Sequence, residues 1–430
     1  MEIGIGLLGC GTVGQSVVKL LQDKATNYGQ RTEAQLVIRG ALVKTPGKSR
    51  PGLRPEQLTT NPDDILTHPD IQIVVEVMGG VEDSREYLLK ALHAGKHVVT
   101  ANKELMAKHG AELFDAANEN GCAIYYEAAV AGGIPIIQTL KRSLIANHLH
   151  SIYGIINGTT NYILSAMTEA GRDFGEVLKE AQDKGFAESD PTDDVEAFDA
   201  VYKIGILASL IFDRRIPVDA IHRVGIQRIS AQDIAHAKEL GYVIKLLAIA
   251  KRGAHGFETR VHPTMIPAQH PLASVNGVYN ALLVQGDAVG DLMFYGKGAG
   301  GMPTASAVVS DILNIAVEMD APPNLLMGCQ HPPQEAELAP AEKVMNRYYL
   351  RLQAEDRTGV LGQLGALMGE ADMSIHTLTQ KKHAQGRAEL VIITHPVSEL
   401  KLRQVVAKIQ QLDIIHTVDS IIRVEDFEGS

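Results

Sequence analysis

The stretch Ile3-Gly-Ile-Gly-Leu-Leu-Gly-Cys-Gly-Thr-Val-Gly14 decides the fold of the N-terminal region. Its first half is an apolar run that predicts a strand, and the segment behind it has helical periodicity. The three glycines between strand and helix have GxGxxG spacing. The first permits a tight turn, the second lets the backbone approach a pyrophosphate, and the third allows close helix–strand packing. The helix start offers unpaired N–H groups to phosphates, so this stretch predicts dinucleotide binding, with an ordinary structural turn as the alternative. The residues assigned to the cofactor on this basis are Gly9, Gly11, Thr12, Val13 and Gly14.

Further apolar runs follow at intervals that predict alternating strands and helices. The predicted strands cover residues 34–43, 71–77, 97–100 and 123–126, and the predicted helices include 83–94 and 104–120. Strands that alternate with helices indicate a parallel, doubly wound sheet of Rossmann type. We therefore predict an α/β nucleotide-binding domain over residues 1–134.

The remainder of the chain divides into a middle and a C-terminal part. Residues 135–325 mix helices with extended segments, which predicts a domain of α+β class. Residues 326–345 are rich in proline and glutamate without periodicity, which predicts a linker. Residues 346–430 read as β-α-β-β-α-β, the order of a small ferredoxin-like domain.

Composition narrows the class of protein. The chain has 430 residues, a net charge of -11 and no basic run, which argues against nucleic-acid binding. The three cysteines, Cys10, Cys122 and Cys329, lie far apart and fit a reducing compartment. No stretch is apolar over the length that a membrane span needs. We expect a soluble, cytoplasmic protein with no nucleic-acid or membrane partner.

The end of the second predicted strand bears on the choice of nicotinamide cofactor. An acidic residue there would bind a ribose 2′-hydroxyl, but this chain has Val43-Lys44-Thr45, with Lys48 and Arg50 beyond. A cation suits a 2′-phosphate, so NADP(H) is expected in preference to NAD(H). The alternative is that Lys44 is a solvated loop lysine.

Carboxylates cluster ahead of a single lysine in the segment 188–203. Lys203 is the only charged residue between Ala200 and Phe212. An ammonium in so apolar a context is partly desolvated, whereas nearby carboxylates favour its charged form; such a balance suits proton transfer to a carbonyl oxygen. Asp199 lies one helical turn before Lys203, and the alternative reading of the two is a surface ion pair.

A second lysine follows the fourth strand of the predicted sheet, in Thr100-Ala-Asn-Lys103. Ligands of open α/β sheets bind outside the carboxyl ends of the strands, so Thr100 and Lys103 are positioned to reach cofactor or substrate. A surface lysine at a helix start is the alternative.

Taken together, the glycine motif, this lysine segment and two further blocks resemble the homoserine dehydrogenase family. The blocks are Asn157-Gly-Thr-Thr-Asn-Tyr-Ile-Leu164 and Glu188-Ser-Asp-Pro-Thr-Asp-Asp194. The segment Asp356-Arg-Thr-Gly-Val-Leu361 resembles the first turn of an ACT regulatory domain. The resemblance covers nearly the whole chain. It implies NAD(P)-dependent interconversion of L-aspartate 4-semialdehyde and L-homoserine, in the biosynthesis of threonine, methionine and isoleucine.

The resemblance also implies roles for individual residues. Lys203 is similar to the family's proton donor, and Lys103 to its second active-site lysine, which contacts cofactor and substrate. Either lysine remains open as the group that delivers the proton. Residues implied to contact the substrate are Glu188, Asp194 and Asp199, and those implied beside the cofactor are Gly185 and Gly300.

Three further properties rest on the resemblance. A monovalent cation, usually sodium, is implied near the domain hinge, bound mostly through backbone oxygens of Glu127, Val130, Gly132 and Ile134. The ACT domain implies feedback control by L-threonine. The resemblance further implies that residues 135–325 form the catalytic and dimerisation domain, with about 300–325 returning to the nucleotide domain, and that the chain forms a homodimer or homotetramer.

The sequence departs from the family's pattern in one place, and two rival functions are open. Many relatives have glycine at Ala197 or Phe198, and a bulkier side chain there is expected to tighten helix packing. The nearest rival is another dehydrogenase of small amino or hydroxy acids, which a substrate panel would distinguish. A non-catalytic amino-acid sensor is the other, although the intact lysines and acids favour an enzyme.

Overall fold

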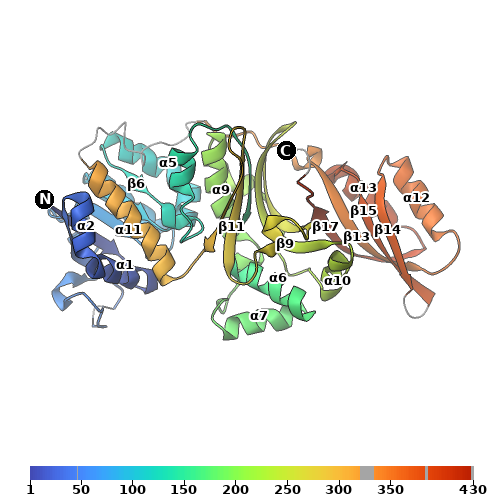
Figure 1. Cartoon of the computed structure of the whole chain (residues 1–430), viewed down its shortest axis with the longest axis horizontal. Coiled ribbons are helices and arrows are strands. Elements are labelled where there is room, and N and C mark those ends of the chain that lie inside the picture. Colours follow the sequence, from blue (N-terminus) through green and yellow to red (C-terminus); the bar gives the residue numbers. More distant parts are fainter. Residues whose placement is uncertain (46, 320–333, 383–385, 428–430) are drawn as a thin grey trace. The chain divides into compact units, whose positions relative to one another are not determined.

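The computed structural model describes residues 1–45, 47–319, 334–382 and 386–427 (Figure 1). Residues 320–333, with the end of the predicted middle domain, the start of the predicted linker and Cys329, lie outside the described residues. The chain forms two compact units. The first comprises Met1–Leu149, Tyr202–Asp219 and Asn280–Ala336, and the second His150–Val201, Ala220–Tyr279 and Glu337–Ser430. The division passes through helix α9, Phe198–Phe212.

The first unit contains a six-stranded parallel sheet in the order β3-β2-β1-β4-β5-β6. This order reverses on either side of β1, so the prediction of a doubly wound sheet is confirmed. The strands are β1 Glu2–Leu8, β2 Gln35–Leu42, β3 Leu58–Thr59, β4 Ile73–Glu76, β5 His97–Thr100 and β6 Ile124–Tyr125. The helices are α1 Thr12–Asp23, α2 Ala25–Thr32, α3 Asp63–Leu66, α4 Glu82–His93 and α5 Lys103–Glu119. Short helical turns follow at Pro55–Gln57, Glu127–Ala129 and Thr139–Ser143.

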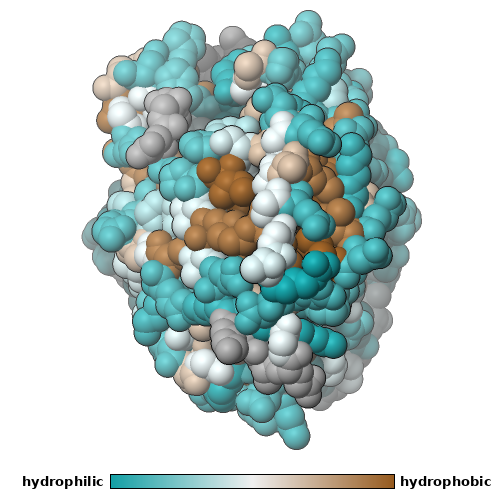
Figure 2. Space-filling model, turned by 90° about the vertical axis from the view of Figure 1, so that its right-hand side faces the viewer, coloured by the Kyte–Doolittle hydropathy of each residue, from teal (hydrophilic) through white to brown (hydrophobic). Residues whose placement is uncertain are grey.

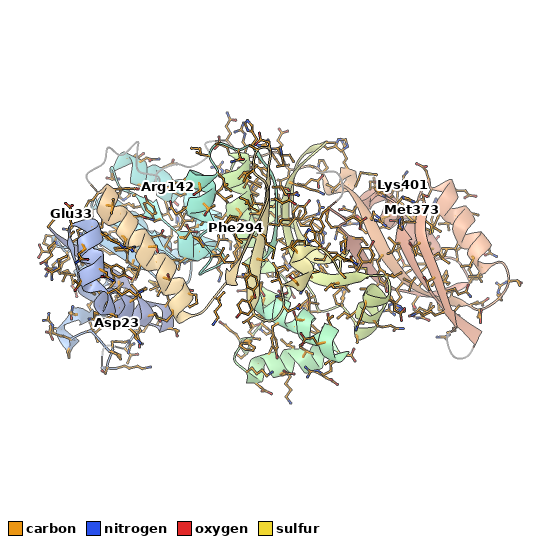
Figure 3. All side chains as sticks on the ribbon, viewed as in Figure 1. Asp23, Glu33, Arg142, Phe294, Met373 and Lys401 are labelled. Atoms are coloured by element: carbon orange, nitrogen blue, oxygen red, sulfur yellow. The ribbon has the colours of Figure 1, made fainter. Side chains whose placement is uncertain are left out.

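A late segment of the chain completes the core of this sheet. Helix α11, Gly301–Glu318, packs against α1, and its apolar side chains from Ala305 to Ala316 join the same core as Ile3, Ile5 and Val17. Arg142, labelled in Figure 3, donates to Glu318 of this helix and to the hydroxyl of Tyr125. The unit also holds the neighbouring strands β11, Tyr279–Gly286, and β12, Gly290–Lys297.

The second unit is built on a mixed sheet in the order β7-β9-β10-β17-β13-β15-β14, with β8 beside β10 and β16 beside β13. Its first part has strands β7 Leu149–Ile155, β8 His222–Arg223, β9 Tyr242–Gly253 and β10 Gly256–Pro267. The helices are α6 Gly158–Ala170, α7 Phe174–Asp183, α8 Thr192–Val195 and α10 Ala231–Glu239, with short turns at Val218–Ala220 and Pro271–Ser274. Helices α6 and α10 pack on β9 and on each other.

The C-terminal part of this unit has the predicted β-α-β-β-α-β order. Its elements are β13 Met345–Glu355, α12 Val360–Glu370, β14 Ile375–Lys382, β15 Arg387–Thr394, the two-residue β16 Val397–Ser398, α13 Glu399–Ile409 and β17 Ile415–Val424, after a short turn at Ala341–Lys343. Alternate residues of β13, such as Leu350 and Leu352, face an apolar core formed with both helices. Strand β17 also pairs in parallel with β10, through Thr264 and Met265, so the ferredoxin-like sheet continues into the middle of the chain.

Within the described ranges, none of the helices combines the length and hydrophobicity that crossing a bilayer requires.

Candidate functional site

The glycine-rich turn has the geometry that its sequence predicts. Gly9 has a φ of +99°, and a Cβ there would lie 2.9 Å from Cα of Met78, just behind β4. A Cβ at Gly14 would lie 2.5 Å from the carbonyl oxygen of Gly9, whereas Gly11, which begins α1, has open space around it. Any side chain at the first or third glycine would therefore displace backbone, and the second leaves room for a close ligand. Thr12 and Val13 form the first turn of α1.

The carboxyl ends of β4 and β5 are joined by a buried carboxyl group. Glu76 is fully buried and accepts from the hydroxyl of Thr100 at 2.6 Å and from the N–H groups of Met78 and Gly79 at 2.9 and 3.0 Å. Burial raises the pKa of Glu76 and these donors lower it. The Thr100 hydroxyl is thus engaged within the protein, where it fixes the turn opposite Gly9.

The cationic residues behind β2 occupy different positions. Lys44 is exposed just beyond the end of the strand. Arg50 folds back: its Nε donates to the carbonyl oxygen of Cys10 at 3.1 Å, and its Nη1 donates to that of Lys48. A guanidinium therefore lies against the glycine-rich turn. The sequence contained this residue, but nothing in its spacing indicated that contact.

The two candidate catalytic lysines lie on neighbouring helices of the first unit. Lys103 begins α5, whose start is capped by the Asn102 side chain, which accepts from the N–H of Leu105 at 3.1 Å. The sequence neighbours of the two lysines are in contact: Glu104 of α5 accepts from the hydroxyl of Tyr202 of α9 at 3.3 Å. Lys103 and Lys203 are both half-buried. This contact joins the two helix turns that carry the lysines.

Two of the three acidic candidates meet at one amide in the second unit. The Asn157 side chain donates to Asp194 at 2.6 Å and to Asp199 at 2.9 Å. Its oxygen caps α6 by accepting from the N–H and the hydroxyl of Thr160, both at 2.9 Å. Asn157 and Asp199 are buried. The cap thus fixes the asparagine, which in turn holds two carboxylates together.

A backbone kink between α8 and α9 allows both carboxylates to reach Asn157. Ala197 is fully buried and has a φ of +69°, a conformation that glycine adopts with less strain. The expected tightening of helix packing is therefore not the main consequence of alanine here, since the backbone itself is strained. The kink is held by Gly225, where a Cβ would lie 2.4 Å from the carbonyl oxygen of Val195.

The other candidates of the second unit lie near the end of α7. Gly185 has a φ of +73° and terminates the helix, with its N–H donating to the carbonyl oxygen of Gln182 at 3.0 Å. Glu188 is exposed, and its backbone carbonyl accepts from the Gln182 side chain at 3.1 Å. The structure does not bring the Glu188 side chain into the Asn157 cluster through any described hydrogen bond.

In the segment implied to bind sodium, the buried Glu127 lies next to the buried Asp311 of α11. Ala131 and Gly132 both have positive φ, and a Cβ at Gly132 would lie 2.4 Å from the carbonyl oxygen of Gly298. Glu127 accepts from the N–H groups of Ile137 and Gln138, and its own N–H donates to Asp311 at 2.8 Å. Burial raises the pKa of Glu127 and of Asp311. The other residues implied to bind sodium, Val130 and Ile134, are buried in the same segment. Gly300, which is implied to lie beside the cofactor, directly precedes α11 and has a φ of +118°.

Among the described residues, no group of three or more His, Cys, Asp and Glu side chains is arranged to hold a metal ion.

Family models match three successive parts of the chain. Residues 9–127 match the NAD-binding domain of homoserine dehydrogenase, residues 135–313 match homoserine dehydrogenase itself, and residues 348–413 match the ACT domain. A homoserine dehydrogenase from a Synechocystis species is 47% identical over 99% of this chain and 100% of its own length. The chain belongs to the homoserine dehydrogenase family. It is thus an NAD(P)-dependent oxidoreductase with a C-terminal ACT domain.

Solved structures agree with this assignment. The crystal structure of a homoserine dehydrogenase from Thiobacillus denitrificans has a TM-score of 0.95 and 42% identity, and the match covers 99% of each chain. A hyperthermophilic archaeal homoserine dehydrogenase in complex with NADPH has a TM-score of 0.63 and 25% identity, over 75% of this chain and 99% of that one. A nicotinamide cofactor follows from the NAD-binding domain.

Within this homoserine dehydrogenase chain, sequence reasoning missed the residues that hold the candidates in place. Asn157 was part of a recognised block, but its role emerges only from contacts with residues 37 and 42 positions later. Lys245 had a signal that went unused, since it is the only charge in the apolar run from Val243 to Ala250. The same pattern had singled out Lys203.

Proposed function

We propose that the chain interconverts L-homoserine and L-aspartate 4-semialdehyde with Lys203 as proton donor, within the biosynthesis of threonine, methionine and isoleucine. The observation that carries this proposal is the Asn157 cluster, because one amide joins the two sequence blocks at the half-buried Asp194 and also holds the buried Asp199. Asp199 is one helical turn from Lys203 on α9. Fixed carboxylates there suit the ammonium of an amino-acid substrate and of the lysine.

In the reducing direction, bound nicotinamide would supply a hydride to the aldehyde carbon. The carbonyl oxygen then gains negative charge, which the Lys203 ammonium neutralises before giving up one proton to form the alcohol. Lys103 would orient cofactor and substrate or share this proton. Glu188, which is exposed, would bind the substrate ammonium together with Asp194.

A substrate panel tests the proposed reaction. Reduction of the nicotinamide should occur with L-homoserine and be lost with 4-hydroxybutyrate, which lacks the amino group that the acids are proposed to hold. Equal turnover of both compounds would instead favour a general hydroxy-acid dehydrogenase.

For the cofactor, we propose NADP(H) in preference to NAD(H). Support comes from Arg50, which lies against the glycine-rich turn, and from the exposed Lys44 at the end of β2. Both are cations at the edge of the sheet where a 2′-phosphate would bind, and among the described ends of β1 and β2 no acid stands in their place. Gly185 and Gly300 are proposed to lie beside the cofactor.

Replacing both Lys44 and Arg50 by alanine should lower the preference for NADP over NAD by about 100-fold or more, since two charge-assisted contacts to a phosphate are each worth about 1.5–3 kcal/mol. The measurement is kcat/KM with each cofactor. Arg54→Ala is the matched control, because Arg54 is exposed and pairs with Glu56. An unchanged ratio in the double variant would remove both residues from cofactor selection.

We also propose a sodium ion held by backbone oxygens of Glu127, Val130, Gly132 and Ile134. Asp311 Oδ1 is buried without a hydrogen-bond partner among the described residues, next to the buried Glu127. Two carboxyl groups that share a buried site make a cation favourable there. The segment thus fits a hard monovalent ion, with oxygen as the sole ligand type.

The ACT domain is proposed to bind L-threonine near the turn Asp356–Val360 and to inhibit the enzyme. A buried polar network supports such coupling, because it joins the domain's open sheet face to α10. Arg351 donates to Asp233 at 2.8 Å, and His236 contacts Glu389 at 2.8 Å. Because β17 pairs with β10, removal of the whole domain would expose a strand edge, so a single substitution is the sharper test.

Glu389→Gln should raise the threonine concentration needed for half inhibition by about tenfold or more, because coupling energies between sites are typically 1–3 kcal/mol. Uninhibited kcat should change little. Glu370→Gln is the matched control, since Glu370 is exposed at the end of α12 in the same ACT domain. Inhibition that is the same in the wild type and Glu389→Gln would contradict coupling through this network.

A homodimer or homotetramer is proposed for the assembly. The face drawn in Figure 2 carries a group of apolar residues within a hydrophilic surround. Exposed apolar side chains of the ACT domain include Leu361 of α12 and Leu400 of α13. We also propose a cytoplasmic location, which is consistent with the burial of Cys10 and Cys122 at distant places in the chain.

A further inference from the structure

Lys245 of β9 is a buried ammonium surrounded by neutral oxygens. Lys245 exposes only 1% of its surface to solvent. Nζ donates to the carbonyl oxygen of Val275 at 2.5 Å, to the side-chain oxygen of Asn276 at 2.9 Å and to that of Asn161 at 3.4 Å. These are three acceptors for the three N–H groups of an ammonium. Burying a charge costs free energy unless the group is hydrogen-bonded, so the Lys245 ammonium requires these contacts to remain in the interior.

The acceptors belong to the segment 275–279 and to helix α6, which are joined by further bonds. The Asn161 side chain donates to the carbonyl oxygens of Val275, Gly277 and Tyr279 at 3.2, 3.0 and 3.0 Å. One turn later, the Ser165 hydroxyl accepts from the N–H of Gly277 at 3.2 Å. The segment 275–279 is therefore clamped to the first turns of α6, and Lys245 joins both to β9.

The same segment touches the residue next to the acidic cluster. A Cβ at Gly158 would lie 3.0 Å from the carbonyl oxygen of Val278, so the segment packs directly on the start of α6. We propose that Lys245 is a positioning residue: its ammonium holds the segment 275–279 against α6 and so fixes the Asn157 side chain that gathers Asp194 and Asp199. This inference rests on the proposed role of those two acids in binding homoserine.

The surroundings of Lys245 make this clamp sensitive to pH. Burial lowers the pKa of Lys245 to about 8, and Glu169 of α6 opposes that shift. The segment 275–279 contains no Asp, Glu, Lys, Arg or His. Burial raises the pKa of Tyr153 on β7 and lowers that of His262 on β10 well below its ordinary value, so both are uncharged. The buried ionisable groups of α10 are engaged with the ACT domain, as Asp233 with Arg351 and His236 with Glu389.

Loss of a proton from the Lys245 ammonium therefore removes its positive charge and one of its three N–H donors. Below pH 8 the clamp is complete, and above it the clamp weakens. The kcat/KM for L-homoserine should show a descending limb near pH 8 that depends on Lys245.

Lys245→Met, which keeps the length of the side chain without its donors, should raise KM for L-homoserine by about tenfold or more, because three buried acceptors are left without this donor. KM for the nicotinamide should change less than about threefold. Lys96→Met is the matched control: Lys96 is also buried and donates to the carbonyl oxygens of His68 and Ile71, in the nucleotide-binding sheet. Its KM for homoserine should equal that of the wild type.

Asn276→Asp gives a second, gentler test that does not depend on how Lys245→Met folds. A carboxylate against the ammonium stabilises its charged form and should move the descending limb upward by about one pH unit. A limb at the same pH in wild type and Asn276→Asp, or an unchanged KM in folded Lys245→Met, would overturn the inference. Failure of the wild type to oxidise homoserine would instead overturn the proposed function.

Discussion

Replacing Lys203 by alanine is expected to lower kcat by about 10²- to 10⁴-fold, which is the usual contribution of one positioned general acid. The alkoxide that forms on hydride transfer then has no ammonium to neutralise it, so the loss falls on the transition state and not on ground-state binding. The affinity for the nicotinamide should stay within about threefold, because the glycine-rich turn proposed to bind it is untouched.

A small primary amine added to the Lys203→Ala enzyme should restore part of the activity, as it returns the missing acid to the vacated space. Lys179→Ala is the control, since Lys179 is exposed on α7 and its loss should not alter kcat. Near-normal turnover of Lys203→Ala would leave Lys103 as the proton donor. That outcome would also contradict the interpretation that the apolar residues after Lys203 adapt this lysine to proton transfer.

The second large effect is expected from Asp199→Asn, which should reduce kcat/KM for L-homoserine by about 100-fold. The substitution preserves the volume but removes a buried negative charge that Asn157 orients at 2.9 Å. Losing one partner of a buried charged contact typically costs about 2–5 kcal/mol. The new amide would also face the Asn157 donor with an N–H group in one of its two orientations, which disturbs the cap of α6.

Asp193→Asn is the matched control, because Asp193 lies in the same acidic run but is exposed. Its kcat/KM should remain within about twofold of the wild type. Equal effects of the two substitutions would mean that net charge near α9, and not the Asn157 cluster, determines activity. Thermal unfolding of both variants checks that Asp199→Asn still folds.

The parts of the fold with local sequence signals could be predicted. Strand β5 has the predicted bounds His97–Thr100, because apolar periodicity is a local property. The turn at Gly9 could also be predicted, since the chemistry of three glycines at fixed spacing admits few conformations. The ferredoxin-like order of the C-terminal part followed from the same periodicities.

Contacts between distant residues could not be predicted in this way. The pairing of Thr264 with Arg423, which continues one sheet into the next, joins residues far apart in the chain and has no periodic signature. Likewise, the contact of Arg50 with Cys10 depends on how a loop folds back. The positive φ of Ala197 could not be predicted, because alanine does not indicate this conformation, whereas a glycine at this position would have indicated it.

The most direct test of the account is the reaction with L-aspartate 4-semialdehyde and reduced nicotinamide, with the product identified by chromatography. We predict that one molecule of L-homoserine forms for each nicotinamide oxidised. Oxidation of the nicotinamide without homoserine, or no oxidation at all by the folded wild-type protein, would contradict the account.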